Sequence, residues 1–387
     1  MKITDIQACV IGKQEPHSGG SVWTFVRVYT DEGIVGTGEC NSGGPGYSGF
    51  ATKSAILAMK PWLIGEDPFN VNLIYEKLRR VGRYGGSTNA PLIFALTGID
   101  NALYDIMGKA LGVPVYKLLG GKFRDTIRLY ADCHAGEAEE PQAYADKALE
   151  VVAQGFGAVK FDVDNTGVGK LDPYNWTASA KEMTHVIALI EGIRGALGYE
   201  IDLAIDCHGQ FDLPSAITLA KAVEPLRLLW LEEPVPAENL NALAQVRRSS
   251  STVICTGENQ YTRFEFLEMF AAKAVDVIMP DLAKAGGIAE GKRIADIADA
   301  HYIPIAPHNV SSPLGMMAAC HVMASVPNFL LLEFHAMNIP WWNDLCEGDR
   351  PFVANGAMAL SERPGIGVEL NDSVAKSLLW GGDTYFD

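Results

Sequence analysis

Short apolar runs that each end in a polar residue recur along the chain from about residue 126 onward. Each run is four to seven residues long, which suits a buried strand. Stretches with apolar residues three and four apart separate the runs, so the alternation predicts parallel strands joined by helices. The eight runs are Ile127–Asp132, Ala158–Asp162, Leu203–Asp206, Leu228–Glu232, Val253–Glu258, Val275–Asp281, Ile303–His308 and Phe329–Glu333.

The polar residues that end the last six runs follow one another at intervals of 23 to 27 residues. One strand, one helix and two loops need about that length, so eight such units predict an α/β fold, a TIM-type barrel over residues 126–355. A doubly wound sheet is the competing fold, but no Gly-x-Gly-x-x-Gly follows the first strand. Because a barrel places its active site at the carboxyl ends of its strands, the terminal polar residues are the functional candidates.

Residues 1–125 have a different pattern and predict an N-terminal α+β capping domain. Thr24–Thr30 and Ile34–Glu39 predict two strands joined by a tight turn, and Leu92–Met107 has the apolar periodicity of a helix. Residues 356–387 have no place in the eightfold repeat. We expect this C-terminal segment to pack back against the capping domain.

Composition and charge narrow the functional classes. Apolar residues make up 48% of the chain, which is enough for a large buried core. The net charge of −16 argues against nucleic-acid binding and against an anionic membrane surface. The seven scattered cysteines favour reduced thiols over a disulfide or zinc framework, and the start lacks a signal peptide. We therefore expect a soluble, cytoplasmic protein without a membrane span.

Three carboxylates, Asp206, Glu232 and Glu258, end consecutive predicted strands and would line one rim of the barrel. Uncompensated, they would repel one another, and a hard divalent cation resolves that repulsion. All-oxygen ligation favours Mg²⁺ or Mn²⁺ over zinc. Taken singly, each acid is as easily a surface residue, and Glu233 is an alternative to Glu232. Strand alternation and the even spacing favour Glu232.

Asp281 and His308 end the next two strands and predict a general base. An aspartate that holds an imidazole fixes its tautomer and raises its basicity. A histidine satisfied within a polar rim is the alternative. On the last strand, Glu333 is a candidate to hydrogen-bond a substrate oxygen or to orient a neighbour, and His335 is a weaker candidate for contact with the substrate.

Lys160 and Asp162 share one face of the second predicted strand. Lys160 is suited to neutralising a substrate carboxylate or pairing with Asp206. A structural pair between Lys160 and Asp162 remains equally open.

Asp206 and His208 point the same way at the end of their strand. A carboxylate substrate chelated to the cation has an acidified α-proton, which His308 can remove to give a metal-stabilised enediolate. His208, next to the ligand Asp206, is placed to protonate a departing β-hydroxyl. Together these steps make a dehydration.

The candidate residues lie in five short motifs, which are Asp206-Cys-His208, Leu231-Glu-Glu-Pro-Val235, Thr256-Gly-Glu258, Pro280-Asp281 followed by Ala285-Gly-Gly287, and Pro307-His308. These motifs resemble those of the enolase superfamily, in its mandelate racemase and muconate lactonizing subgroup, and within that the galactonate-dehydratase type of acid-sugar dehydratase. The helix sequence from Gly98 to Gly121 is also similar to the helix before the barrel in these enzymes.

This resemblance implies a (β/α)₇β barrel with an α+β cap and Mg²⁺ on Asp206, Glu232 and Glu258. It also implies an Asp281–His308 base, His208 as the acid and Glu333 near the enediolate. Homo-oligomers, octamers among them, are common in the family. The implied reaction converts a sugar acid, an aldonate or aldarate, to a 2-keto-3-deoxy acid.

One departure bears on the reaction. Racemases and lactonising members of the subgroup carry Lys-x-Lys on the second barrel strand, whereas this chain has Lys160-Phe-Asp162. The second lysine base is missing, which favours a single base at His308 over two-base racemisation. A racemase or epimerase using the same enediolate is the main alternative. A barrel glycosidase with two carboxylates and a non-catalytic sugar-acid sensor are weaker ones.

Substrate specificity is expected to come from the capping loops, because a barrel mouth needs a lid that excludes water. The candidates there are His17, Tyr47 and Arg83, each of which is equally open to a packing role. The sequence does not name the sugar acid or its stereochemistry.

Overall fold

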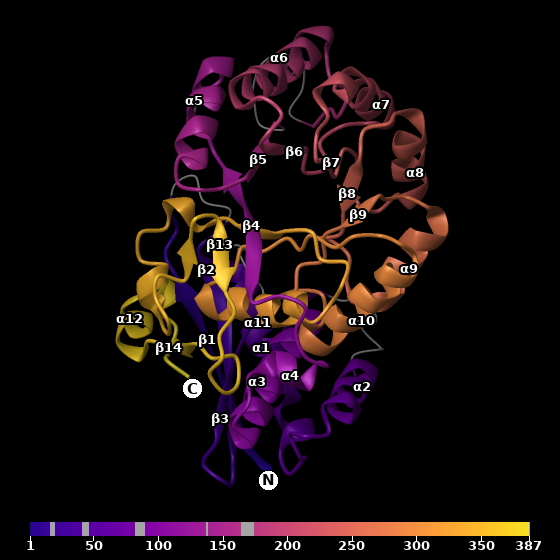
Figure 1. The fold of residues 1–387 in the computed structure, drawn as a ribbon. Coiled ribbons are helices and arrows are strands. Elements are labelled where there is room, and N and C mark those ends of the chain that lie inside the picture. The colour runs from indigo at the N-terminus through magenta and orange to yellow at the C-terminus, as the bar shows by residue number, and fades with distance from the viewer. Residues whose placement is uncertain (16–19, 41–45, 82–89, 137, 164–173, 387) are drawn as a thin grey trace.

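The computed structural model describes residues 1–15, 20–40, 46–81, 90–136, 138–163 and 174–386. An antiparallel sheet with its helices forms the N-terminal part, which lies against one side of a barrel of strands and helices (Figure 1). Among the described residues, no helix is both long enough and apolar enough to cross a membrane.

The N-terminal part is built on a three-stranded antiparallel sheet. Strands β1 (Ile3–Gly12), β2 (Val22–Thr30) and β3 (Val35–Cys40) pair in sequence order, and the β2–β3 hairpin matches the predicted pair of strands. Strand β1 was not among the strands predicted from the sequence. Helices α1 (Gly46–Leu63) and α3 (Ala90–Leu111) pack on this sheet, while α2 (Val71–Val81) and α4 (Val115–Leu118) pack against α3.

The barrel alternates strands with helices and closes on itself, as predicted. Strand β10 pairs in parallel with β4, and isolated bridges at Ile305 link β9 to the segment before β10. The parallel strands are β4 (Thr126–Cys133), β5 (Ala158–Asp162), β6 (Asp202–Asp206), β7 (Trp230–Glu232), β8 (Ile254–Thr256), β9 (Val277–Ile278) and β10 (Leu332–Phe334). The helices are α5 (Pro141–Val152), α6 (Ala180–Leu197), α7 (Leu213–Ala222), α8 (Leu240–Ser249), α9 (Thr262–Ala272), α10 (Gly287–Ala300) and α11 (Pro313–Ala324).

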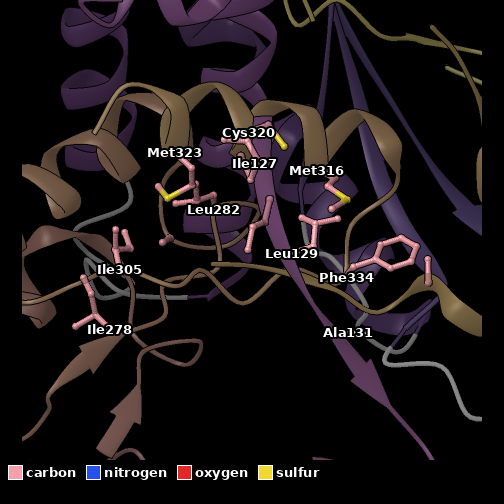
Figure 2. Packing of buried hydrophobic residues seen from close by; sticks show 14 of the residues in the cluster. Ile127, Leu129, Ala131, Ile278, Leu282, Ile305, Met316, Cys320, Met323 and Phe334 are labelled. Carbon is pink, nitrogen blue, oxygen red and sulfur yellow. The ribbon is translucent and has the colours of Figure 1, made fainter. Parts of the chain in front are cut away.

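The alternating faces of the barrel strands give two cores. A small inner cluster includes Tyr130, Trp230 and Met279, which fill the barrel interior. A larger cluster lies between the strands and the surrounding helices. Figure 2 shows part of it, where Met316 and Cys320 of α11 lie over Leu129 and Ile127 of β4. All twelve residues of α11 are buried, so this helix is central to the molecule.

The C-terminal segment contacts both parts of the molecule. Strand β13 (Ala357–Ala359) pairs with β4 of the barrel, while Asp383 accepts a hydrogen bond from the backbone of Val10 and pairs with Lys53 at 2.6 Å. The remaining strands and helix are β11 (Cys346–Glu347), β12 (Val353–Ala354), β14 (Glu369–Leu370) and α12 (Asp372–Ser377). Short 3-10 helices occupy Glu224–Leu226, Ala336–Asn338, Asn343–Leu345 and Trp380–Gly382.

Candidate active site

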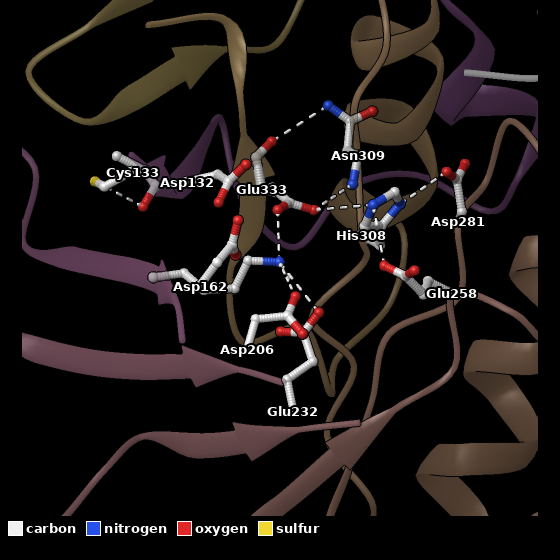
Figure 3. A network of polar contacts seen from close by, with 12 residues as sticks. Asp132, Cys133, Asp162, Asp206, Glu232, Glu258, Asp281, His308, Asn309 and Glu333 are labelled. Atoms are coloured by element: carbon white, nitrogen blue, oxygen red, sulfur yellow. Dashed lines mark hydrogen bonds and ion pairs between the residues drawn. The ribbon is translucent and has the colours of Figure 1, made fainter. Parts of the chain in front are cut away.

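Polar side chains gather just beyond the inner apolar layer of the barrel, at the carboxyl ends of its strands (Figure 3). Strand register brings them together, because Asp162 lies opposite Asp206 and Asp206 lies opposite Glu232 along β5, β6 and β7. Lys160 is two residues before Asp162 and therefore points into the same interior. The sequence thus places several charged groups at one end of the barrel.

Lys160 lies at the centre of this cluster and contacts three of its carboxylates. Its Nζ lies 3.2 Å from Asp206 Oδ2, 3.1 Å from Glu232 Oε1 and 2.8 Å from Glu333 Oε1 (Figure 3). Burial alone would lower the pKa of Lys160, but the carboxylates of Glu232 and Glu333 raise it well above its ordinary value. Lys160 is therefore a fixed cation at the base of the site. In the described part of the chain, the partners of Lys160 are Asp206, Glu232 and Glu333 rather than Asp162.

The choice between Glu232 and Glu233 is visible in the backbone. Glu232 points inward, where its Oε2 accepts a hydrogen bond from Trp230 Nε1 at 3.0 Å. Glu233 has a φ of 34° and turns aside, so its carboxylate bonds to Thr256 and Asn259 instead, at 2.9 Å each. Burial and the charge of Asp206 raise the pKa of Glu232 well above its ordinary value.

The three predicted metal ligands share one rim without converging fully. Among the described residues, Asp206, Glu232 and Glu258 do not form a group whose ligand atoms all lie within 4.8 Å of one another. Lys160 bonds to two of these acids, and Glu258 Oε2 lies 3.1 Å from His308 Nε2. Lys160, and His308 when it is protonated, thus contact the acids in this arrangement. The ligand set stays a prediction.

His308 has the contacts expected of a general base. Its Nδ1 lies 2.8 Å from Asp281 Oδ2, which fixes the ring and leaves Nε2 facing the acid cluster. Lys284 also contacts Asp281, at 3.3 Å. Burial lowers the pKa of His308, but Glu258 and Glu333 outweigh it and the pKa is raised. The two residues that the sequence paired are therefore in direct contact.

His208 differs from His308 in its exposure. Its side chain is 41% exposed, and its Nε2 lies 3.6 Å from Asp206 Oδ2. The backbone of His208 is left-handed, with a φ of 44°, and its N–H donates to Asp206 Oδ1 at 2.9 Å. His208 also lines a cavity of about 630 Å³, beside Gln210 and Asn259. That volume suits a small ligand.

A histidine that was not predicted from the sequence, His134, lies beside Asp162 on the side away from Asp206. His134 Nδ1 lies 3.5 Å from Asp162 Oδ2, and His134 Nε2 lies 3.7 Å from Asp132 Oδ2. Burial lowers the pKa of His134, but Asp132 outweighs it and raises the pKa to about 9. The signal was present, because Asp132-Cys-His134 repeats the pattern of Asp206-Cys-His208.

Asp162 therefore lies between two Asp-Cys-His strand ends. It forms one potential ligand group with Asp132 and His134 and another with Asp206 and His208. Burial, with the charges of Asp132 and Asp206, raises the pKa of Asp162 well above its ordinary value. Asp132 Oδ1 is buried and has no hydrogen-bond partner among the described residues.

The side chains of the substrate-binding residues predicted in the capping loops lie outside the part of the chain that the structure describes. His17 and Arg83 lie outside the described residues, as does the side chain of Tyr47. His335 is buried, donates from its Nε2 to the carbonyl of Gly20 at 2.8 Å, and packs edge-on against Trp23. Burial lowers the pKa of His335 to about 4, so its neutral ring is engaged between the barrel and the cap.

Comparison with known proteins identifies the family. Residues 18–120 match the mandelate racemase / muconate lactonizing enzyme N-terminal domain, and residues 143–374 match the enolase C-terminal domain-like family. The chain is 41% identical over 387 residues to a D-xylonate dehydratase of Haloferax volcanii, covering 100% of this chain and 91% of that protein. It is 35% identical to a D-galactonate dehydratase of Xanthomonas axonopodis pv. citri, covering 92% and 90%.

The solved structures agree with the sequence relatives. A mandelate racemase/muconate lactonizing enzyme-like protein from Rubrobacter xylanophilus superposes with a TM-score of 0.93 at 44% identity, covering 100% of this chain and 99% of that chain. The predicted (β/α)₇β barrel with its α+β cap is confirmed, as is the predicted resemblance. The protein belongs to the enolase superfamily, in its mandelate racemase and muconate lactonizing enzyme group.

Proposed function

We propose that this protein is a Mg²⁺-dependent hydro-lyase that dehydrates a sugar acid, an aldonate or aldarate, to a 2-keto-3-deoxy acid. The contact of 2.8 Å between His308 and Asp281, facing the acids around Lys160, carries the proposal. Relatives that match nearly the whole chain are named as dehydratases of D-xylonate and D-galactonate. Both names describe aldonates, so these two acids are the first substrates to test.

The acid cluster fits a divalent cation. Asp206, Glu232 and Glu258 offer oxygen donors only, which suits Mg²⁺ or Mn²⁺. The raised pKa of Glu232 supports the fit, because this buried carboxyl lacks enough positive charge to ionise readily. When bound, the cation would acidify the α-proton of a chelated carboxylate and stabilise the charge that develops on it.

The residues divide the remaining chemistry. His308 Nε2 takes the α-proton, and its imidazolium is held by Asp281. The electron pair of the broken C–H bond then expels the β-hydroxyl, to which His208 donates a proton, so that water leaves. Lys160, which Glu333 orients at 2.8 Å, holds the charge of the substrate carboxylate. The resulting enol tautomerises to the 2-keto acid.

The racemase alternative is not favoured. Two-base racemisation needs a base on the opposite face, where the second strand presents Asp162 in place of a lysine. Asp162 lies 3.5 Å from His134, and burial with the charges of Asp132 and Asp206 raises its pKa. A barrel glycosidase would leave the His308–Asp281 pair without a role. The dehydratase names of the relatives point the same way.

A screen of aldonates and aldarates with Mg²⁺ tests the proposal. Keto-acid formation is followed with and without excess chelator, and D₂O reports removal of the α-proton. We expect a 2-keto-3-deoxy acid from at least one acid, with activity lost in chelator and restored by Mg²⁺. Recovered substrate with deuterium and inverted configuration, without keto acid, would establish the racemase instead.

We further propose that the protein is a cytoplasmic homo-oligomer. All seven cysteines are buried and none is in a disulfide, in keeping with a reducing compartment. The oligomeric expectation rests on the family resemblance. Light scattering coupled to size-exclusion chromatography measures it directly, and a mass near 41.8 kDa would contradict it.

A further inference from the structure

Glu39 is a fully buried carboxylate that joins the cap to the barrel. It lies near the end of β3, and its oxygens accept hydrogen bonds from the backbone N–H groups of Ser312 and Gly315, each at 3.0 Å. The hydroxyl of Ser312 also donates to it. These donors belong to the N-cap and first turn of α11, where a negative charge is favourable.

The approach between Glu39 and α11 is close. A Cβ added at Gly315 would lie 2.8 Å from the carboxyl carbon of Glu39, a separation that real Cβ atoms do not show. Only glycine allows the carboxylate to reach the N–H groups at this turn. The position of Glu39 therefore fixes the start of α11 tightly.

The segment between His308 and α11 is held at each step. The N–H of Asn309 donates to Glu333 Oε2 at 2.7 Å. The carbonyl of Val310 accepts a hydrogen bond from Trp23 Nε1 at 2.7 Å. The carbonyl of Ser311 accepts one from Trp342 Nε1 at 2.9 Å. Trp23 lies on β2, so with Glu39 the cap contributes two of these restraints.

We propose that Glu39 is a positioning residue for the catalytic base, acting together with Trp23 on the four residues that follow His308. The cap then does more than cover the barrel, because its docking sets where the His308 imidazole stands. This inference rests on the proposed function, which assigns the base to His308. Misplacing a catalytic group by about 1 Å reduces rates on the order of 100-fold.

A purely structural role for Glu39 makes a different prediction. If the residue only holds the two parts together, its loss lowers the melting temperature and leaves the kinetics of the folded enzyme unchanged. A positioning role lowers kcat and leaves KM nearly constant, since substrate contacts remain. The pH profile of kcat also shifts when the environment of the base changes.

Asp105 offers a matched control in the same cap. It is a buried carboxylate on α3 that accepts hydrogen bonds from the backbone of Thr37 at 3.0 Å and of Ile366 at 2.9 Å. It therefore joins the cap to the C-terminal segment rather than to the His308 segment. Glu39→Gln and Asp105→Asn make the same isosteric change at comparable burial.

The experiment compares both variants with the wild type below their melting temperatures, on a sugar acid that the wild type dehydrates. We expect Glu39→Gln to lower kcat about 10- to 100-fold, with KM within about twofold and slower α-proton exchange in D₂O. Asp105→Asn should melt earlier with kcat unchanged. Absence of wild-type turnover on every sugar acid would count against the proposed function, which is a separate result.

The positioning role is overturned if Glu39→Gln keeps the wild-type kcat and pH profile, or if Asp105→Asn loses kcat equally. If Glu39→Gln does not fold, Trp23→Phe decides, because it removes the hydrogen bond to Val310 and keeps an aromatic ring. A fall in kcat at constant KM supports the proposal for that variant. Wild-type kinetics in Trp23→Phe overturn it.

Discussion

His308 and His208 have opposite environments, and their proposed roles need that difference. His308 is buried, bonded to Asp281, and raised in pKa by nearby carboxylates. His208 is partly exposed, lines a cavity and sits on a left-handed backbone. A base must be oriented toward one carbon, whereas an acid must reach a hydroxyl on the next carbon.

Replacing His308 by Asn should abolish exchange of the α-proton. The amide keeps the approximate size of the ring and has no basic nitrogen, so we expect exchange in D₂O to fall by on the order of 10² to 10⁴. Proton NMR of the recovered sugar acid measures it. The exposed His301 supplies the control variant His301→Asn, which should exchange normally. Persisting exchange in His308→Asn would assign the base elsewhere.

Replacing His208 by Asn should separate two steps that the wild type couples. Asn tolerates the left-handed backbone at this position, so the fold should be preserved. We expect dehydration to fall by on the order of 10² or more, while α-proton exchange continues because His308 is intact. Keto-acid formation and deuterium uptake are measured in one reaction. Equal loss of both would argue that His208 binds substrate or the cation.

At the scale of single residues, the sequence predicted the residues that end the barrel strands better than it predicted the other residues around them. The pairing of Asp281 with His308, and the inward side chain of Glu232, followed from strand ends and alternation. His134 was missed because the predicted run ended at its polar residue Asp132, two residues earlier. Glu39 gave no signal, since nothing in a strand sequence reveals that its carboxylate reaches a helix more than 270 residues away.

The packing of β3 on α3 depends on glycines. A Cβ at Gly38 would lie 2.0 Å from the carbonyl oxygen of Gly98, and one at Gly36 would lie 2.1 Å from that of Ala102. Glycine inside a strand usually weakens it, and here its absence of a side chain allows the helix backbone to approach. The two elements therefore contact each other backbone to backbone.

Gly38→Ala should destabilise the protein strongly, by about 3 kcal/mol or more, because the methyl group forces β3 away from α3. Gly195→Ala is the matched control. Gly195 is exposed in α6, and an added Cβ there meets no atom within 4 Å, so alanine should stabilise by up to about 1 kcal/mol. Urea unfolding of both variants measures the signs. Similar effects from both would contradict the contact.

Element prediction worked where a polar residue marked the end of an apolar run. The eight runs correspond to the barrel positions, although the seventh is reduced to isolated bridges at Ile305. Strand β1 was not predicted, although Ile6, Ala8 and Val10 are buried at alternate positions, because no polar residue ends its apolar run. The pattern of apolar runs thus predicts order and type, while extent depends on pairing partners.

At the scale of the whole molecule, one buried histidine joins three parts of the chain. His321 lies in α11 of the barrel, where its Nδ1 accepts a hydrogen bond from the backbone N–H of Tyr116 at 3.3 Å. Its Nε2 donates to the carbonyl of Ile366 at 2.9 Å. The ring must be neutral, because a proton on Nδ1 would face the N–H of Tyr116. Burial accordingly lowers the pKa of His321 to about 4.

Other buried groups have raised instead of lowered pKa values, so the dependence of the protein's stability on pH combines opposite contributions. Burial raises the pKa of Glu39 and of Asp100 to about 7. Their contribution is fully present below the unfolded pKa and is lost as the pH rises through 7. His321 is the reverse case, and a variant is needed to isolate it.

We expect the stability that His321 contributes to disappear as the pH falls from 6.5 toward 4. Between these values the unfolded chain binds a proton that the folded chain excludes, so acid lowers the free energy of unfolding, by up to about 3 kcal/mol. His321→Gln keeps a donor and an acceptor without titrating. The wild type should therefore exceed the variant at pH 7 by more than at pH 4.5, measured by urea unfolding. A difference that does not change with pH would mean that protonation of His321 is accommodated, and that its two hydrogen bonds do not require the neutral ring.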